Sequence, residues 1–413
     1  MNAMTDNDEY RGSFYRAVDQ RQANDARQQE YYVPIYDRPE LQTVDVVQEL
    51  FDAIRFTGGA SVQFLSGYKG TGKSSELRRL AGVVQATGRP VVYMTIENYA
   101  STELPLDMSM FPIMLAAGFV GGVGLEEDVR QPLRDRLKGF FTRIKVTPSI
   151  DLGTAGFDVK LALAEDTSFA KQVADVVRNN RLTFMEEFHQ FFTSAVEQIG
   201  LDVSPLFIVD SIDHFRGRDQ VFQEVRESVD RAFSELVEEL QLPSMHVIYT
   251  LPVYVKTELG IKHEVLNIKV SEPDGQPYEP GLAALRDVLT KRAPDGDLDR
   301  LVSNVGDRLI TKTGGSFRDL LRLTGQVLLT TRNLPASEAD FGRAERDLRS
   351  DFEGVMSAEK ADILRAIQDS HQLEPKEDEW PDVIDLMTRG AILRYPNHEK
   401  CWYGVNPLLV ALL

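Results

Sequence analysis

Short apolar runs alternate with amphipathic stretches over the first two thirds of the chain. Leu41–Ile54 and Ser74–Gln85 carry apolar residues at helical spacing. Four apolar runs have the length and composition of buried strands: Ser61–Leu65, Pro90–Ile96, Leu206–Val209 and Met245–Thr250. Strands separated by helices predict an α/β fold, with a parallel sheet that is covered by helices on both faces.

A long segment, at about residues 100–200, separates the second predicted strand from the third. It is far longer than one crossover helix requires. Helices are expected at Met108–Phe119, Glu126–Phe141 and Phe169–Ile199. Between the last two, Lys145–Leu163 alternates apolar and polar residues around two glycines, which predicts a β-hairpin. The pattern leaves open whether this insertion is an elaboration of the core or a surface for a partner.

The last third of the chain is mainly helical in pattern. Leu282–Arg292, Leu298–Lys312 and Phe317–Thr331 predict the helices of a lid domain. The predicted elements that follow are two helices and two short strands joined by a turn, the order found in a winged-helix module: Ala358–Gln368, Trp380–Thr388, Ala391–Tyr395 and Trp402–Val405. The expected domains are a polar arm that is mobile or a loosely docked helix (1–30), an α/β core with the insertion (31–270), a helical lid (271–350) and the winged-helix module (351–413).

A phosphate-binding loop follows the first predicted strand. Its residues are Gly67, Tyr68, Lys69, Gly70, Thr71, Gly72, Lys73 and Ser74, with Ser75 next on the predicted helix. Glycines let consecutive N–H groups turn toward phosphate oxygens, and the helix N-terminus favours negative charge. Lys73 would reach the β- and γ-phosphates of ATP, and the Ser74 hydroxyl would hold Mg²⁺. A chance match is disfavoured because a strand precedes the loop and a helix follows it.

Further candidate residues stand at the ends of the third and fourth strands and at the start of a lid helix. Asp210 follows four apolar residues and would hold Mg²⁺, directly or through water. Asp213 is the candidate to orient or deprotonate the attacking water, with a helix-capping role as the alternative. Thr250 would contact the γ-phosphate or the water, with an ordinary threonine at a strand end as the alternative. Arg318 would reach back to the phosphates, although an exposed helix arginine is the plain alternative.

Composition and charge restrict the partners. The net charge is −18, and strong acidity disfavours a dedicated nucleic-acid binder, since phosphate contacts need Lys and Arg. The single cysteine, Cys401, excludes an internal disulfide or a cysteine-built zinc site. No apolar run of about 18 residues is present, and the first residues have no signal-peptide core, so we expect a cytoplasmic protein that does not contact membranes.

Taken together, these motifs resemble the AAA+ and STAND-type ATPases, particularly the Orc/Cdc6-like prokaryotic branch. The resembling segments are GYKGTGKS as Walker A, LFIVDSID as Walker B, VIYT as sensor 1, GGSFRDLLRL as sensor 2, and the terminal winged helix. The resemblance implies Mg²⁺-dependent ATP hydrolysis, with PIYDR (34–38) near the adenine. Ser211 stands where many AAA+ enzymes have Glu, which implies slow or partner-stimulated hydrolysis. Arg226, Arg231 and Arg292 are candidates for an arginine finger.

The expected function is that of a regulatory ATPase, a nucleotide-dependent switch. The resemblance implies a homo-oligomer and a separately encoded effector protein, as in bacterial antiphage defence systems. The alternative is a DNA-dependent loader or transposition regulator that grips DNA through the winged helix. Against this, residues 351–413 hold twelve acidic and six basic residues, a net charge of −6. A small-molecule kinase would not explain the sensor 2 helix or the C-terminal module, and an ABC transporter subunit would need a signature motif that is missing before Walker B.

Overall fold

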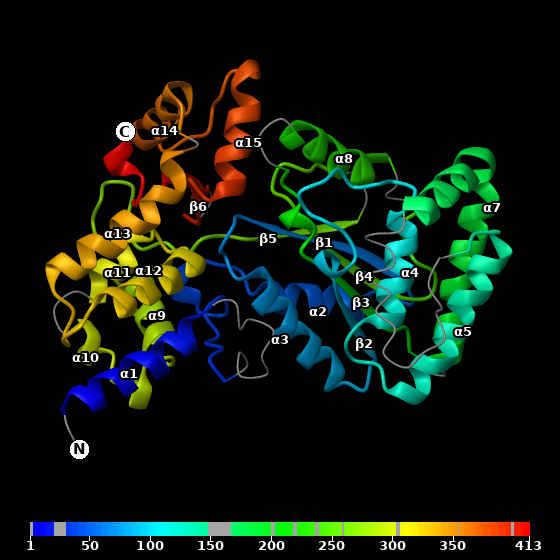
Figure 1. The fold of residues 1–413 in the computed structure, drawn as a ribbon, viewed down its shortest axis with the longest axis horizontal. Helices are drawn as coiled ribbons and strands as arrows, with labels where there is room; N and C mark the ends of the chain where they lie inside the picture. Colours follow the sequence, from blue (N-terminus) through cyan, green and yellow to red (C-terminus); the bar gives the residue numbers. More distant parts are fainter. Residues whose placement is uncertain are drawn as a thin grey trace. The chain divides into compact units, whose positions relative to one another are not determined.

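The computed structural model describes residues 3–19, 30–147, 167–199, 203–217, 221–235, 239–257, 260–302, 306–354, 356–397 and 400–413 (Figure 1). The chain divides into two compact units. Unit 1 comprises residues 1–45, 67–72 and 265–413, and unit 2 comprises 46–66 and 73–264. The phosphate-binding loop therefore belongs to unit 1, whereas the strand before it and the helix after it belong to unit 2.

Unit 2 is built on a five-stranded sheet of order β2-β3-β4-β1-β5. Its strands are β1 (Ser61–Gly67), β2 (Val91–Thr95), β3 (Leu206–Asp210), β4 (His246–Leu251) and β5 (Ile261–Val265). The pairs β1–β4, β3–β4 and β2–β3 are parallel. Parallel strands all end at one edge of the sheet, so the loop after β1 and Asp210 at the end of β3 leave the sheet on the same edge.

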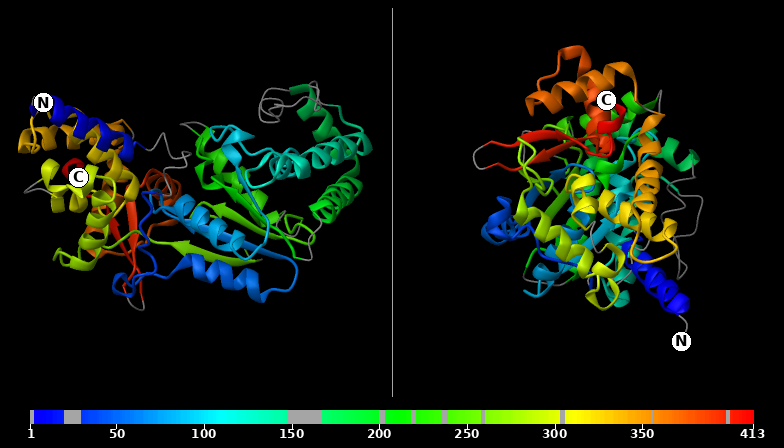
Figure 2. Two further views of the ribbon diagram at one scale, coloured as in Figure 1. Left: turned by 90° about the horizontal axis from the view of Figure 1, so that it is seen from below. Right: turned by 90° about the vertical axis from the view of Figure 1, so that its left-hand side faces the viewer.

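Helices cover both faces of this sheet (Figure 2). They are α2 (Val46–Phe56), α3 (Lys73–Gln85), α4 (Phe111–Gly121), α5 (Glu127–Arg143), α7 (Thr167–Ile199) and α8 (Phe222–Glu235), with the short turns η4 (Ile96–Asn98) and η5 (Ile212–His214). Helices α2 and α3 pack together on one face, and α4 lies on the other against β2. The parallel sheet with helices on both faces, and the phosphate loop after β1, confirm the predicted α/β fold class of P-loop ATPases.

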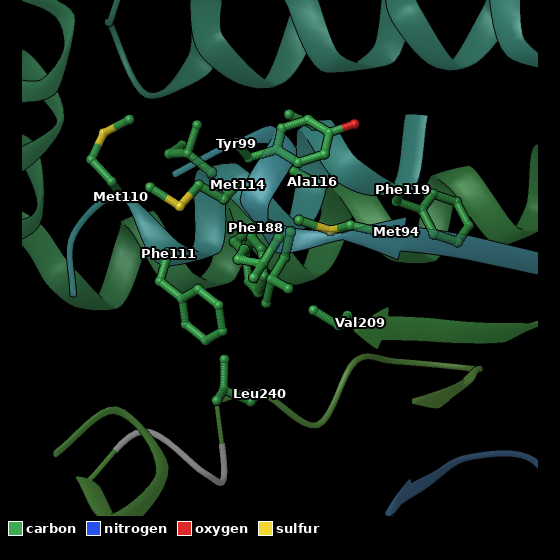
Figure 3. Packing of buried hydrophobic residues seen from close by; sticks show 14 of the residues in the cluster. Met94, Tyr99, Met110, Phe111, Met114, Ala116, Phe119, Phe188, Val209 and Leu240 are labelled. Atoms are coloured by element: carbon green, nitrogen blue, oxygen red, sulfur yellow. The ribbon is translucent and has the colours of Figure 1, made fainter. Parts of the chain in front are cut away.

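The insertion is part of the main core of unit 2. Helix α4 is apolar on every side, and its residues from Phe111 to Val120 are all buried. The Phe119 ring meets the Phe207 ring of β3 edge-on, with centroids 5.3 Å apart. Gly118 lets the helix approach the sheet closely, because a side chain at this position would collide with Met94 of β2. Figure 3 shows Met94 among the packed residues of this core. The insertion therefore buries apolar surface of the sheet; most of the predicted hairpin, 148–163, lies outside the described residues.

The helical part of unit 1 contains α1 (Ala3–Val18), η3 (Pro39–Leu41), α9 (Glu279–Thr290), η7 (Pro294–Gly296), α10 (Asp299–Val302), α11 (Gly306–Lys312), α12 (Phe317–Thr330) and α13 (Glu338–Glu353). Helix α1 packs on α12. Its buried residues, Tyr10, Phe14, Ala17 and Val18, recur at helical spacing, so the docked helix rather than a mobile arm describes residues 3–18.

The chain ends with the predicted pair of helices and short hairpin. These elements are α14 (Ala358–Ser370), η8 (Glu377–Glu379), α15 (Trp380–Arg389), β6 (Ile392–Tyr395), β7 (Trp402–Val405) and η9 (Val410–Leu412). Strands β6 and β7 are antiparallel, and Tyr395 and Trp402 pair across them with ring centroids 4.5 Å apart. None of the described helices has the length and apolarity needed to cross a membrane.

Candidate nucleotide-binding site

The loop Gly67–Gly72 has the backbone that phosphate binding requires. Gly70 and Gly72 have φ angles of 83° and 93°, a region that favours glycine. Helix α3 begins directly afterwards, at Lys73. The first N–H groups of a helix have no acceptor within that helix, and its N-terminus is the positive end of the helix dipole, so the start of α3 favours an anion. Ser74 is half-buried and Ser75 is exposed.

Within unit 1 the loop packs against the start of α12, the predicted sensor 2 helix. The Phe317 N–H donates to the Gly70 carbonyl oxygen at 2.9 Å. A side chain at Gly70 would place its Cβ 2.5 Å from Ser316 Oγ and 2.9 Å from Arg318 Cβ. Ser316 caps α12 by accepting the Asp319 N–H. The half-buried Arg318 therefore starts its side chain next to Gly70 of the loop; its contact with phosphates stays a prediction.

The N-terminal segment also holds the loop. The Tyr36 hydroxyl lies 2.5 Å from the Thr71 carbonyl oxygen and 2.9 Å from that of Leu266. Its ring meets the Phe317 ring edge-on, at 6.3 Å. Tyr36 is 3% exposed and lies inside the PIYDR segment. The segment expected beside the adenine therefore contacts the phosphate loop itself.

The C-terminal module lies next to the same loop at Gly390, and Asn406 joins the module to α12. A Cβ at Gly390, which follows α15, would lie 3.8 Å from Lys69 Cβ. Asn406 is fully buried and donates from Nδ2 to Asp319 Oδ2 at 2.9 Å and to the Gly390 carbonyl oxygen at 3.0 Å. Burial raises the pKa of Asp319, although the hydrogen bond from Asn406 opposes the rise. Loop, lid helix and C-terminal module thus form a closed ring of contacts within unit 1.

In unit 2, Lys73 and Asp213 form an ion pair. Lys73 Nζ lies 3.0 Å from Asp213 Oδ2, and the two side chains are only 7% and 10% exposed. Burial would raise the pKa of Asp213, but the charges of Lys73 and His214 and the hydrogen bonds from Lys73 and Thr250 outweigh it, so the pKa falls below 3.8. Asp213 is therefore ionised at neutral pH. Lys73 and Asp213, which were predicted from different sequence motifs, are therefore in direct contact.

Thr250 completes this group from the end of β4. Its side chain is fully buried, and its Oγ1 accepts the Ile212 N–H at 3.0 Å. This contact fixes η5, the turn that carries Asp213. The threonine therefore links β4 to the candidate catalytic carboxylate, in addition to the hydrogen bond it makes to Asp213.

Asp210 ends β3 with both carboxylate oxygens engaged. Oδ1 accepts the Ser211 N–H at 2.7 Å, and Oδ2 accepts the Tyr93 hydroxyl at 2.5 Å. Ser211 has a φ of 71°, a left-handed conformation that turns the chain sharply after the strand. Asp210 is 2% exposed, so its charge is fixed in place by donors rather than by water.

Glu97 and His214 form a second, more exposed pair. His214 Nδ1 lies 2.7 Å from Glu97 Oε1, and the side chains are 44% and 46% exposed. Burial would lower the pKa of His214, but Asp213 and Glu97 outweigh it and raise the pKa above 6.5. Glu97, a carboxylate just after β2, is therefore held by a histidine that directly follows Asp213.

The residues present fit an ATP–magnesium complex. A Cβ at Gly67 would lie 2.6 Å from the Val265 carbonyl oxygen, so only glycine fits where the loop leaves β1. No three His, Cys, Asp or Glu side chains gather as a metal site in the part of the chain that the structure describes. Mg²⁺ commonly takes one or two protein oxygens and completes its shell with phosphates and water, which suits Ser74 and Asp210.

Sequence reasoning did not find Tyr93, Asn406 or the Glu97–His214 pair. Tyr93 is one tyrosine in an apolar strand, and Asn406 follows a short hairpin strand. Neither position carries a spacing signal.

Of the candidate arginine-finger residues, Arg292 donates to the carbonyl oxygens of Tyr31 and Val288 in its own unit, whereas Arg231 is exposed on α8.

Comparison with solved structures adds a likeness in fold. No protein-family model matches the chain, and no curated protein matches its sequence. The chain is similar to the crystal structure of Cdc6p from Pyrobaculum aerophilum, with 13% identity and a TM-score of 0.34. The match covers 92% of this chain and 94% of the other. The fold assignment rests on the strand order and the phosphate loop of this chain.

Proposed function

We propose that the chain is an ATP-binding and ATP-hydrolysing regulatory ATPase of the AAA+/STAND type, which works as a nucleotide-dependent switch in the cytoplasm. The observation that carries the proposal is the ion pair of Lys73 with Asp213, at 3.0 Å, where the phosphate loop enters α3. A lysine at this place in a phosphate loop neutralises the β- and γ-phosphates. A carboxylate beside it is within reach of the water that attacks the γ-phosphate.

The ion pair suggests how nucleotide binding prepares hydrolysis. Lys73 exchanges Asp213 for the phosphates of ATP, which are also anionic acceptors. Asp213 is then left near the γ-phosphate, with Thr250 bound to the same turn, and accepts the proton of the attacking water. Bound Mg²⁺ would neutralise charge that develops on the phosphate oxygens. Ser74 and Asp210 are the residues that would hold the ion.

Replacing Lys73 by Ala tests the site. We expect Lys73→Ala to abolish ATP binding in equilibrium titrations while thermal unfolding stays cooperative. Lys291→Ala, at an exposed lysine, is the matched control and should bind ATP like the wild type. Normal ATP affinity in a folded Lys73→Ala protein would refute the assignment of the site.

The switch follows from what surrounds the loop in unit 1. The Gly70 carbonyl oxygen accepts a hydrogen bond from the Phe317 N–H, and Gly390 lies next to Lys69, so phosphates that order the loop would also order the lid helix and the C-terminal module. We expect ATP to promote self-association, as the AAA+ type implies, and Arg318→Ala to weaken this response. Sedimentation that is identical with ATP, with ADP and without nucleotide would count against this part of the proposal.

A protein effector, as in an antiphage defence system, is the proposed partner of the C-terminal module. Its net charge is −6. Most of its basic side chains form ion pairs: Lys360 and Arg389 with Asp385, Arg365 with Asp362, and Lys376 with Glu379. Phosphate contacts would require breaking these pairs. Duplex DNA binding below about 1 μM at physiological salt, lost on removing residues after Met356, would instead favour the DNA-dependent loader.

A further inference from the structure

Strand β2 places a tyrosine hydroxyl on the candidate magnesium-binding carboxylate. Tyr93 pairs in register with Ile208, two residues before Asp210, so its side chain reaches diagonally along the sheet. Its hydroxyl donates to Asp210 Oδ2 at 2.5 Å, while the Ser211 N–H donates to Oδ1 at 2.7 Å. Both donors are held in place by the sheet. The Tyr93 hydroxyl comes from β2, which pairs with β3, and the Ser211 N–H comes from the turn that directly follows β3.

These two donors determine which acceptor sites of the Asp210 carboxylate remain for a metal ion. An ionised carboxylate has about four acceptor sites, so two donors leave about two sites free, with fixed directions. The ring of Tyr93 is supported on its other side by α3, where the Arg78 guanidinium carbon lies 5.8 Å from the ring centroid. Helix α3 also carries Ser74, the second candidate ligand. The tyrosine therefore lies between the two elements that would hold the ion.

Packing alone does not require the hydroxyl. The strand reads Val-Val-Tyr-Met-Thr, and a phenylalanine ring would fill the same volume in this half-buried position. A hydroxyl at this depth costs free energy unless it finds a partner. Its partner is the one carboxylate of β3 that the sequence motif assigns to magnesium.

We propose that Tyr93 is a positioning residue, which orients Asp210 toward magnesium-bound nucleotide. The inference rests on the proposed function and names a residue that acts through Asp210 rather than on ATP. Hydrogen-bonded partners of metal ligands typically change metal affinity or activity by about 10–100-fold when they are removed.

The test compares magnesium dependence in Tyr93→Phe and in a matched control. A fluorescent ATP analogue is titrated into each full-length protein, once with Mg²⁺ and once with EDTA. The control is Tyr249→Phe, which removes a buried hydrogen bond of the same kind from β4, the 2.9 Å bond of the Tyr249 hydroxyl to the Leu240 carbonyl oxygen. Mg²⁺ titrations of ATP hydrolysis are run on the same three proteins.

We expect Tyr93→Phe to bind the analogue normally in EDTA but to lose most of the tightening that Mg²⁺ produces. Half-saturating Mg²⁺ for hydrolysis should rise by about 10-fold, with the maximal rate approached again at high Mg²⁺. Tyr249→Phe should keep the wild-type magnesium dependence. The inference is overturned if Tyr93→Phe has wild-type magnesium dependence, or if Tyr249→Phe shifts it equally. A wild type that binds no ATP would refute the proposed function itself.

Discussion

Replacing Asp213 by Asn removes one charge from the ion pair with almost no change in shape. The Nζ–Oδ2 distance is 3.0 Å and both side chains are nearly buried. With an effective dielectric constant of about 20, the attraction at this distance is roughly 5 kcal/mol before desolvation is subtracted. In Asp213→Asn an amide oxygen still accepts from Lys73, but the buried Lys73 charge loses its opposite charge. We therefore expect the unfolding free energy without nucleotide to fall by about 3–5 kcal/mol.

The effect on turnover should be larger and of a different kind. If Asp213 accepts the proton of the attacking water, its loss should lower kcat by about 100-fold or more. ATP affinity should be kept or improved, because Lys73 no longer has a competing carboxylate. Ser211→Ala is the control, since its backbone N–H still bonds Asp210 and its φ of 71° is as costly for Ala as for Ser. Its kcat should stay within a few-fold of the wild type.

The pH dependence of unfolding tests how much the ionised Asp213 carboxylate stabilises the protein. A carboxylate whose pKa is lowered by folding stabilises the protein above its unfolded pKa, and this stabilisation is lost as the pH falls through the folded pKa. The folded pKa of Asp213 lies below 3.8, so the difference between wild type and Asp213→Asn should be constant near neutral pH and shrink only in acid. Steady-state phosphate release and urea unfolding measure the two effects. Unchanged kcat in a folded Asp213→Asn protein would refute the catalytic role and favour Glu97.

Three further perturbations test other parts of the account. Gly70→Ala should strain the loop, because its Cβ would lie 2.5 Å from Ser316 Oγ at a φ of 83°, and equilibrium titration should show ATP affinity reduced by at least about tenfold. Asn406→Ala should leave Asp319 without its buried donor and, in hydrogen exchange, uncouple protection of β6–β7 from ATP; unchanged ATP-dependent protection would contradict the ring of contacts. Burial lowers the pKa of His246 to about 4, so stability should fall by about 3 kcal/mol as the pH drops from 6.5 to 4, and urea unfolding of His246→Gln should show a flatter acid limb.

The sequence predicted most elements of the sheet and its helices, within a few residues at each end. The helix expected from Leu41 begins instead at Val46, because Gln42 adopts a left-handed φ of 56° after η3 and interrupts the turn. Leu298–Lys312 is divided between α10 and α11. Periodicity alone does not show such breaks, since the apolar spacing continues across them.

Strand β5 and helix α13 are two of the missed elements, and they were missed for different reasons. Strand β5 contains Lys262, His263 and Glu264, and its half-exposed edge position needs no apolar run. Helix α13, in contrast, has a readable start, because Ser337 and Asp340 form a capping box before the apolar positions of the helix. A search for capping signals would have found it.

The sequence predicted individual residues of the candidate site, but it did not predict which of them contact one another. Lys73 and Asp213 come from motifs about 140 residues apart, and they meet because the order of the sheet places β4 between β1 and β3. That order is a tertiary property that local patterns do not encode. The same holds for the Tyr93 hydroxyl and the Asn406 amide, because their hydrogen bonds to Asp210 and Asp319 also depend on tertiary structure.

A structure of the full-length protein with a non-hydrolysable ATP analogue and Mg²⁺ tests the central claim most directly. The account predicts the β-phosphate inside the loop, within hydrogen-bond distance of N–H groups from Gly70 to Ser74. Lys73 Nζ should have left Asp213 Oδ2 for the phosphates. An analogue bound away from this loop, or one bound there with Lys73 still paired to Asp213, would contradict the account.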